Sequence, residues 1–386
     1  MRKGWEYKKL GEVCDVINGY AFKSSKYTSQ GTRIIRITNV QKGYVVDNDP
    51  KFYSDEDFKD LFQYSLFEGD LVMSLTGNVG RVGILQKNML PAALNQRVAC
   101  LRVKSKKMQL NYLFHLLNSN LFENAAIQSA RGIAQLNMST EWLKNYIIPL
   151  PPLSTQLAIV SELDKINELI RLKKEQLKDF DNLAQSLFFE MFGDPVENEK
   201  GWEVKKLNEI VSDNCSISYG IVQPGDGVEN GVPVVRPVDM TKTFVSRKGL
   251  KNTTKEISDS YKRTILKGNE ILMCVRGTTG LISMATPELQ GCNVTRGIAP
   301  IECGPTCDKW FVFYQILNPA IQHHIAEYTR GIALKQINMK DVRDIPLCLP
   351  PLSLQRLFAQ RIEQIEREKS EVQKSIQDLE TLLASR

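Results

Sequence analysis

Two long stretches of the chain repeat apolar residues in alternating steps of three and four. The first stretch follows Ser154 and the second follows Ser353, and each has one lysine, Lys173 or Lys369, where the pattern would place an apolar residue. Such spacing over about four heptads is typical of a coiled coil, in which a buried polar residue helps to fix the register. The predicted seam residues are Leu163, Ile166, Ile170, Leu177, Phe180, Leu187, Ile362, Ile365, Val372, Ile376, Leu379 and Leu383.

A proline phrase stands before each of these stretches, as "PLPPLSTQ" and then as "LPPLSLQ". Consecutive prolines favour an extended, stiff backbone, so each phrase predicts a rigid entry into a helix. Ser154 and Ser353 stand where an N-cap oxygen is wanted, which predicts spacer helices over residues 154–193 and 353–386. The two helices would most simply pack antiparallel. The alternative is that each lies as an ordinary amphipathic helix on its own globule.

The segments before the two helices have a different pattern. Runs such as "TRIIRITNV" and "EILMCV" carry β-branched residues between Gly, Asn and Asp, which predicts short strands and turns. Later, "LNYLFHLLNSNLFENAAIQ" and "WFVFYQILNPAIQHHIAEY" place apolar residues at helical spacing. Each segment, 1–153 and 194–352, is therefore predicted to be a mixed α+β globule.

The whole pattern is written twice. "GWEYKKLGEV" returns as "GWEVKKLNEI", "IIRITNV" returns as "VVRPVDM", and "MSLTGNVG" returns as "MCVRGTTG". Offsets stay between 197 and 201 residues, which indicates one long duplication. The predicted fold class is α+β: two repeated mixed α/β domains separated by a long antiparallel coiled coil of two helices, with pseudo-twofold symmetry.

Composition fits this organisation. The 386 residues are 42% hydrophobic and 24% charged, as in a globular protein with room for two domains. The opening residues lack an apolar export signal and no run approaches the roughly 18 apolar residues of a membrane helix, which favours a cytoplasmic location. Eight cysteines without CxxC spacing indicate reduced, mostly buried thiols. A zinc site at Cys303 and Cys307 is the alternative, with too few histidines to support it.

Positive charge is concentrated outside the predicted helices. The formal net charge is +6, yet residues 154–192 hold five basic against seven acidic side chains and residues 353–386 hold six of each, so the globules carry +8. An excess of this kind suits contact with phosphate groups.

Three polar clusters recur in both globules. A Gly-x-x-G turn lies beside an arginine in "LTGNVGR" and "VRGTTG"; such turns expose backbone N–H groups to a phosphate backbone, although a plain tight turn needs the same glycines. "LNQRV" and "NVTRG", then "ARGIAQLN" and "TRGIALKQIN", add amide and guanidinium groups that can hydrogen-bond base edges. The candidates for phosphate or base contact are Arg36, Asn78, Arg81, Gln96, Arg97, Arg131 and Gln135 in the first globule and Arg236, Arg276, Thr278, Thr279, Arg296, Arg330, Lys335 and Gln336 in the second. Because the polar letters differ between the copies, we expect two different short sequences to be read.

The sequence offers no catalytic set. It has no Asn-Pro-Pro-aromatic signature of adenine methylation, no Gly-rich cofactor fingerprint and no phosphate-binding P-loop, and its histidines occur only at positions 115, 323 and 324. We therefore predict a recognition protein and no enzyme. An enzyme that modifies DNA by itself and a coiled-coil scaffold that binds only proteins are the alternatives.

In its duplicated proline phrases, "GWEVKKL" openings and Gly-x-x-G loops, the chain resembles the specificity (S) subunit of type I restriction-modification systems. The resemblance covers essentially the whole chain, with Thr155 and Leu354 in place of the acidic residue that usually precedes the glutamine of the phrase. It implies that each globule is a target recognition domain for one half of a bipartite, asymmetric site in double-stranded DNA, and that the coiled coil fixes the unread gap.

The same resemblance implies the partners. Two methyltransferase subunits that use S-adenosylmethionine would dock on the helices, and restriction subunits that use ATP and Mg would join for cleavage, while this chain would bind no cofactor itself. The sequence leaves open whether the assembly restricts DNA or only methylates it in phage defence.

Overall fold

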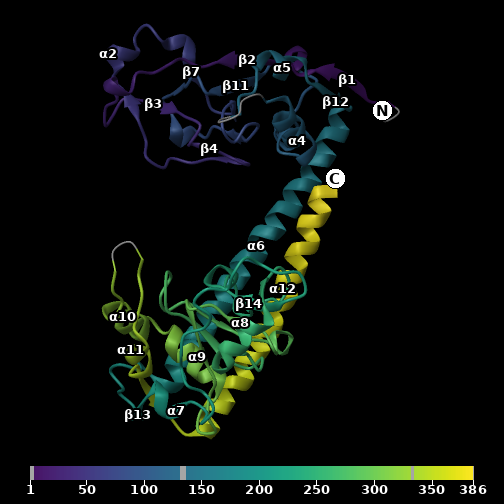
Figure 1. Ribbon diagram of the computed structural model, residues 1–386. Helices are drawn as coiled ribbons and strands as arrows, with labels where there is room; N and C mark the ends of the chain where they lie inside the picture. The colour runs from purple at the N-terminus through teal and green to yellow at the C-terminus, as the bar shows by residue number, and fades with distance from the viewer. Residues whose placement is uncertain (1–3, 131–135, 332–333, 386) are drawn as a thin grey trace. The chain divides into compact units, whose positions relative to one another are not determined.

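The computed structural model describes residues 4–130, 136–331 and 334–385 (Figure 1). The chain divides into two compact units, residues Met1–Leu172 with Ile376–Arg386 and residues Lys173–Ser375. Each of the two long helices therefore contributes one end to each unit. The predicted boundaries kept the helices as separate segments, and they stay a prediction.

The first unit consists of short strands and helices, as the sequence pattern predicts. The run "TRIIRITNV" contains a strand, and the later apolar run forms two helices because Ser119 caps the second of them, its hydroxyl accepting from the N–H of Phe122 at 3.3 Å. The strands are β1 Glu6–Lys9, β2 Cys14–Asn18, β3 Thr32–Ile35, β4 Val40–Gln41, β5 Tyr44–Val45, β6 Phe52–Tyr53, β7 Ser65–Leu66, β8 Leu71–Ser74, β9 Val82–Ile84, β10 Ala92–Leu94, β11 Val98–Val103 and β12 Ile147–Leu150. The helices are α1 Leu10–Val13, α2 Asp55–Phe58, α3 Leu110–Leu117, α4 Asn120–Ser129, α5 Thr140–Asn145 and the start of α6 Leu153–Phe192.

Two four-stranded sheets organise this unit, in the orders β6-β3-β10-β7 and β2-β11-β8-β9. Within the first sheet β3 and β10 are parallel, with Arg33 opposite Ala92, and the other pairs are antiparallel. The apolar sides of β8 and β11 pack on α3 and α4 in a core that includes the fully buried Leu113 and Phe122.

The second unit repeats most of these elements. Its strands are β13 Glu203–Lys206, β14 Val232–Val235, β15 Lys251–Thr253, β16 Ile271–Cys274, β17 Ile282–Met284, β18 Asn293–Val294, β19 Ile298–Ile301 and β20 Pro346–Leu349. Its helices are α7 Leu207–Ile210, α8 Lys255–Ser260, α9 Lys309–Leu317, α10 Pro319–Glu327, α11 Met339–Arg343 and most of α12 Leu352–Ser385. The sheet orders β15-β14-β18 and β17-β16-β19 again contain one parallel pair, β14 with β18. The predicted duplication and the mixed α+β class are confirmed.

The repeated opening of each half pairs with the strand that leads into the proline phrase. β1 is antiparallel to β12, with Glu6 opposite Leu150, and β13 is antiparallel to β20, with Glu203 opposite Leu349. The two sequence words that recur most clearly are therefore the two sides of one ladder in each unit. This ladder fixes where the chain leaves the globule and enters the long helix.

A buried glutamine then attaches the first turn of each long helix to its globule. Gln156 accepts from the N–H of Gln109 at 2.8 Å and donates to the carbonyl oxygens of Lys107 and Pro151 at 2.7 and 2.8 Å. Gln355, also completely buried, repeats this pattern in the second unit. The repeated phrase thus ends on a glutamine because that amide satisfies three backbone groups at the joint.

The bonds of Gln355 show how close the repetition is. Its side-chain oxygen accepts from the N–H of Asp308 at 2.9 Å, and its amide nitrogen donates to Pro350 at 2.7 Å and to Thr306 at 3.5 Å.

The prediction that Ser154 and Ser353 are N-caps is wrong. Both helices begin one residue earlier, at Leu153 and Leu352, because the backbone after the second proline is already helical.

Within the second unit α6 and α12 run antiparallel (Figure 1). Lys369 of α12 bonds Asp181 of α6 at 2.8 Å, and further toward the end of α6 Phe188 meets Phe358, nearer the start of α12, with ring centroids 5.7 Å apart. All of the predicted seam residues are buried or half-buried. Each helix also packs on its own globule, because Val160 of α6 lies in the core of the first globule and Phe358 of α12 meets Tyr314 of α9 with ring centroids 5.6 Å apart. Near its end α6 packs on the second globule as well, where Phe188 stacks on Phe311 of α9 at 5.7 Å. The two arrangements that the sequence left as alternatives therefore occur together.

The seam lysine of α12 lies in a buried polar cluster. The ammonium group of Lys369 is 2.6 Å from the carboxylate of Glu366, which is also reached by the hydroxyl of Tyr314 at 3.5 Å. Burial disfavours the charge of Lys369, but the hydrogen bonds to Asp181 and Glu366 outweigh it and raise its pKa above 10.5. Burial raises the pKa of Tyr314, because it disfavours the charged phenolate. The cluster holds one lysine and two carboxylates in a single register.

In the described ranges, no helix is both long and apolar enough to cross a membrane. The cysteines are free, and most of them are buried. No set of three or more His, Cys, Asp or Glu side chains that could hold a metal ion occurs among the residues described.

We predict that Gln355→Ala lowers the free energy of unfolding by about 2 kcal/mol, because the N–H of Asp308 and the carbonyl of Pro350 lose their partner inside the protein. Urea denaturation of the full chain measures this. Gln360→Ala, at an exposed position of the same helix, is the control and should change stability by less than about 0.5 kcal/mol. Equal effects of the two changes would contradict the role of the buried amide.

We predict that Lys369→Met lowers the free energy of unfolding by about 3 kcal/mol, because the carboxylate of Glu366 is left buried and unpaired. The double change Glu366→Leu with Lys369→Met should recover much of the loss. Arg367→Met, on the exposed side of α12, is the control.

The pH dependence of this effect has a defined sign. The pKa of Lys369 is raised by folding, so its contribution is fully present below the unfolded value of 10.5 and is lost as the pH rises through the higher folded value. The stability difference between the wild type and Lys369→Met should stay constant from about pH 7 to pH 10. A difference that disappears below pH 10 would contradict the assignment.

Candidate nucleic-acid interface

One edge of the first unit gathers the ends of two parallel strands. Because β3 and β10 run in the same direction, Arg36 and the turn 95–97 leave the sheet at the same edge. The N–H of Asn95 donates to the carbonyl of Ile35 at 3.2 Å, which holds the two exits together. Residues 60 apart in sequence therefore become neighbours.

Two further loops join this edge. The N–H of Leu75, at the start of the β8–β9 loop, donates to the carbonyl of Arg97 at 2.9 Å, and the N–H of Met138 donates to Leu75 at 2.8 Å. The hydroxyl of Thr76 also donates to the side chain of Asn137 at 2.8 Å. We call the set formed by Arg36 and residues 75–81, 95–97 and 136–138 the first loop cluster.

The second unit builds the same arrangement. The N–H of Thr295 donates to Val235 at 3.0 Å, Val275 donates to Gly297 at 2.8 Å, and Ile337 donates to Val275 at 3.0 Å. The second loop cluster consists of Arg236 and residues 275–281, 295–297, 330 and 335–337. Arg330 and Gln336 belong to it because their backbones exchange two hydrogen bonds of 2.8 Å.

The structure thus brings the described candidate residues of each globule together at one edge. Arg131 and Gln135 lie outside the described residues.

The Gly-x-x-G turns owe their glycines to backbone conformation. Gly77 and Gly80 have φ of 74° and 81°, and Gly277 and Gly280 have φ of 93° and 84°, where other residues are strained. The N–H of each glycine donates inside the protein, for example from Gly77 to Leu136 at 2.9 Å. The four glycine N–H groups are therefore not free for a phosphate, and the tight-turn alternative explains the glycines. That other backbone N–H groups of these turns contact a phosphate stays a prediction.

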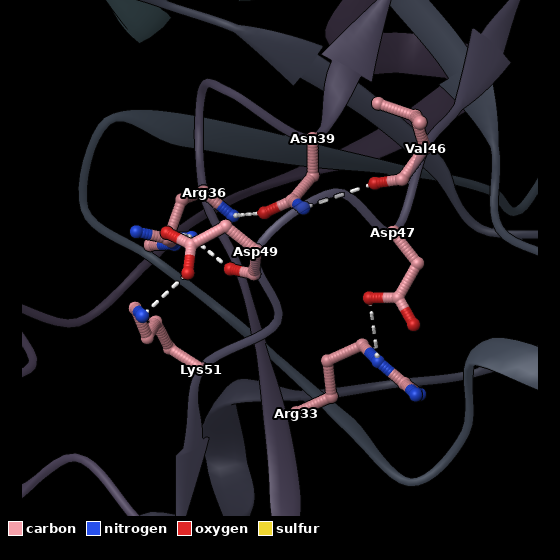
Figure 2. A network of polar contacts seen from close by, with 7 residues as sticks. All are labelled: Arg33, Arg36, Asn39, Val46, Asp47, Asp49 and Lys51. Atoms are coloured by element: carbon pink, nitrogen blue, oxygen red, sulfur yellow. Dashed lines mark hydrogen bonds and ion pairs between the residues drawn. The ribbon is translucent and has the colours of Figure 1, made fainter. Parts of the chain in front are cut away.

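Arg36 is held inside its own loop (Figure 2). Its guanidinium donates to the carbonyl oxygen of Asp49 at 2.6 Å and lies 3.4 Å from the carboxylate of the same residue. The hydrogen bond from Lys51 to that carboxylate, at 2.5 Å, and the neighbouring Arg36 lower the pKa of Asp49. Asn39 receives the N–H of Arg36 at 2.9 Å and closes the turn.

Arg236, at the matching position, is held in a different way. Its Nε and Nη2 atoms donate to the carboxylate of Asp239 at 3.0 and 2.8 Å, and this bidentate contact raises the pKa of the arginine. Both arginines thus stabilise their loops through carboxylates of this chain. The sequence carried a signal only for the turn itself, since Asn39 and Asp239, which accept from the arginine N–H groups, stand three residues after each arginine.

Other candidate side chains are directed outward. Asn78, Gln96, Thr278, Lys335 and Gln336 are exposed, as are three arginines, and Arg276 is half-buried. Arg81 donates to the side chain of Gln41 at 2.9 Å, and Thr279 accepts from the hydroxyl of Thr329 at 3.0 Å. Over the part of the chain that the structure describes, the guanidinium groups without an intramolecular hydrogen bond or ion pair among these candidates are those of Arg97, Arg276, Arg296 and Arg330.

A family model of the type I restriction modification DNA specificity domain matches residues 2–179 and matches again at residues 199–381. The chain belongs to this family. As a type I specificity protein, it has the role of a DNA-specificity subunit, which the sequence predicted. The two matches coincide with the two halves of the duplication.

Two curated relatives match along most of their length. The chain is similar to the specificity subunit of the Escherichia coli type I restriction enzyme EcoBI, with 25% identity over 398 residues that cover 96% of this chain and 81% of the relative. It is also similar to the putative MjaX specificity subunit of Methanocaldococcus jannaschii, with 25% identity over 410 residues that cover 98% and 92%.

Solved structures share the fold. One solved structure bears a title on complex assembly and conformational transition of the type I R-M system. It superposes on this chain with a TM-score of 0.61 at 20% identity, covering 100% of this chain and 97% of the other. The type I S subunit from M. genitalium gives a TM-score of 0.53 at 15% identity, covering 99% and 94%. These likenesses agree with the mixed α/β units and the long helices.

Proposed function

We propose that each loop cluster reads one half of a bipartite, asymmetric target in double-stranded DNA, and that the long helices set the unread gap between the halves. The observation that carries this proposal is the occurrence of one loop cluster twice, on one backbone plan, with different exposed side chains. Because their exposed side chains differ, the two loop clusters would read two different sequences, which supports an asymmetric target.

The outward side chains suit both parts of DNA recognition. Arginine and lysine contacts to phosphates set the register of a protein on the duplex, and amide or guanidinium groups discriminate base edges in the major groove. Arg97 in the first cluster and Arg296 in the second are exposed beside such polar residues. Binding of this kind weakens as salt rises, because each phosphate contact releases counterions.

We propose further that the helices dock two methyltransferase subunits, with restriction subunits joining the full complex. Large apolar side chains on the outer faces of α6 support a protein contact: Leu157, Leu169, Leu172, Leu183 and Phe189 are 46–55% exposed. A solved structure with the same fold bears a title on complex assembly of the type I R-M system, which also supports a protein contact. S-adenosylmethionine would then belong to the methyltransferase partners and ATP with Mg to the restriction partners, while this chain would supply recognition without catalysis.

We predict that random double-stranded DNA selected by this chain, co-expressed with its methyltransferase partner, contains two unequal half-sites and a constant unread gap. Selection at moderate salt followed by sequencing measures this. A single short motif would mean that only one cluster reads DNA. No enrichment at any salt concentration would favour a scaffold that binds only proteins.

We predict that a longer helix pair lengthens the gap and leaves both half-sites unchanged. Seven residues inserted after Leu172 and seven after Ser375 keep the heptad pattern and lengthen each helix by about 10 Å, which corresponds to about three base pairs. The selected motif should then contain a gap longer by up to about three base pairs. A motif with the original gap would contradict the proposal that the helices set the spacing.

A further inference from the structure

The turn after β10 and the turn after β18 hold their central residues in the same backbone environment. The N–H of Gln96 donates to the carbonyl of Tyr20 at 2.8 Å, and the N–H of Arg296 donates to the carbonyl of Ile221 at 2.8 Å. Each acceptor lies in the segment that precedes the parallel pair of strands. Gln96 and Arg296 are therefore structurally equivalent positions.

The hydrogen bond that closes each turn is also the same. The N–H of Val98 donates to Asn95 at 2.9 Å in the first unit, and the N–H of Ile298 donates to Thr295 at 2.9 Å in the second. Close approach of the backbones fixes this geometry further, because a Cβ added at Gly19 would lie 2.1 Å from the carbonyl oxygen of Asn95. The two units thus present the central side chain of the turn on one shared frame.

The side chain on that frame is what differs. Gln96 and Arg296 are both exposed, and neither side chain has a hydrogen bond or ion pair with another described residue. Both lie at the sheet edge where the neighbouring Arg36 and Arg236 are already bound by Asp49 and Asp239. At this equivalent position each turn therefore offers one polar side chain that its own unit does not use, and the first turn also carries the exposed Arg97 beside it.

The chemistry of the two side chains selects different bases. A glutamine amide can present a donor and an acceptor side by side, which match N7 and N6 of adenine, whereas the guanidinium of arginine can present two donors side by side, which match N7 and O6 of guanine. We propose that Gln96 reads an adenine in the first half-site and that Arg296 reads a guanine at the equivalent place in the second. This inference rests on the proposed function, in which each loop cluster faces one half-site.

The test exchanges the two readers. Gln96→Arg should change one adenine of the first half-site to guanine and leave the second half-site unchanged, and Arg296→Gln should do the reverse. Selection and sequencing with the methyltransferase partner present, as for the wild type, gives the motif of each variant. Competition binding with the matched DNA sequences should show a change in preference of about 10-fold to 100-fold.

Lys309→Gln is the matched control for charge. Lys309 is exposed at the start of α9, and β19 separates it from the turn that holds Arg296. This variant removes one positive charge from the same unit, and its selected motif should equal that of the wild type. Arg296→Lys is a second comparison, because it keeps the charge and loses the planar fork. Its preference for guanine should be weaker than that of the wild type, while the salt dependence stays the same.

Each outcome has one meaning. If Arg296→Gln weakens all sequences equally and lowers the salt slope by about one, Arg296 contacts phosphate and the inference is overturned. Unchanged motifs and affinities in both exchange variants would overturn it as well. If the wild type itself selects no bipartite motif, the proposed function fails before the variants are compared. Should Arg296→Gln unfold, the inference would be judged on Gln96→Arg and Arg296→Lys.

Discussion

The buried amide at the first turn of each long helix is the constraint on which each unit depends. Gln156 and Gln355 satisfy backbone donors and acceptors that would otherwise be buried without partners, and they do so where three segments of the chain meet. An unpaired polar group inside a protein costs free energy. Any other direction of the first helical turn would break these hydrogen bonds, so the amide fixes the direction in which the helix starts. Together with the ladder between the opening strand and the last strand, this amide makes the joint between globule and helix rigid.

The loop clusters depend on a second constraint, the parallel pair of strands in each unit. Parallel strands send their carboxyl ends to one edge, and that edge collects residues that lie as far apart in the sequence as Arg36 and Met138. The backbone contacts of the clusters are the same in both units, while their exposed side chains differ. A scaffold with fixed backbone contacts can therefore accept new side chains at positions such as 96 and 296 without losing its fold.

Much of the fold was readable from the sequence, because its signals are local. The period of the seam predicted the long helices, the duplicated words predicted two similar units, and the β-branched runs predicted β3 and β16. The failures have physical causes. Proline at the helix entry allows the helix to begin at Leu153, so Ser154 has no cap to form. The packing of Phe188 against Phe311 depends on a globule that the helical period does not describe.

The candidate site shows most clearly what the sequence determined and what the tertiary structure decided. By itself the sequence determined that arginine, amide and glycine residues recur in corresponding loops of two copies, because duplication and residue type are properties of the chain alone. Only the tertiary structure decided that Arg36 and Arg236 are bound by carboxylates whereas Arg97 and Arg296 face outward. The reason is that a side chain is available for binding only when no nearby group satisfies it, and for Arg36 that group is Asp49, a residue that the folded loop brings into contact.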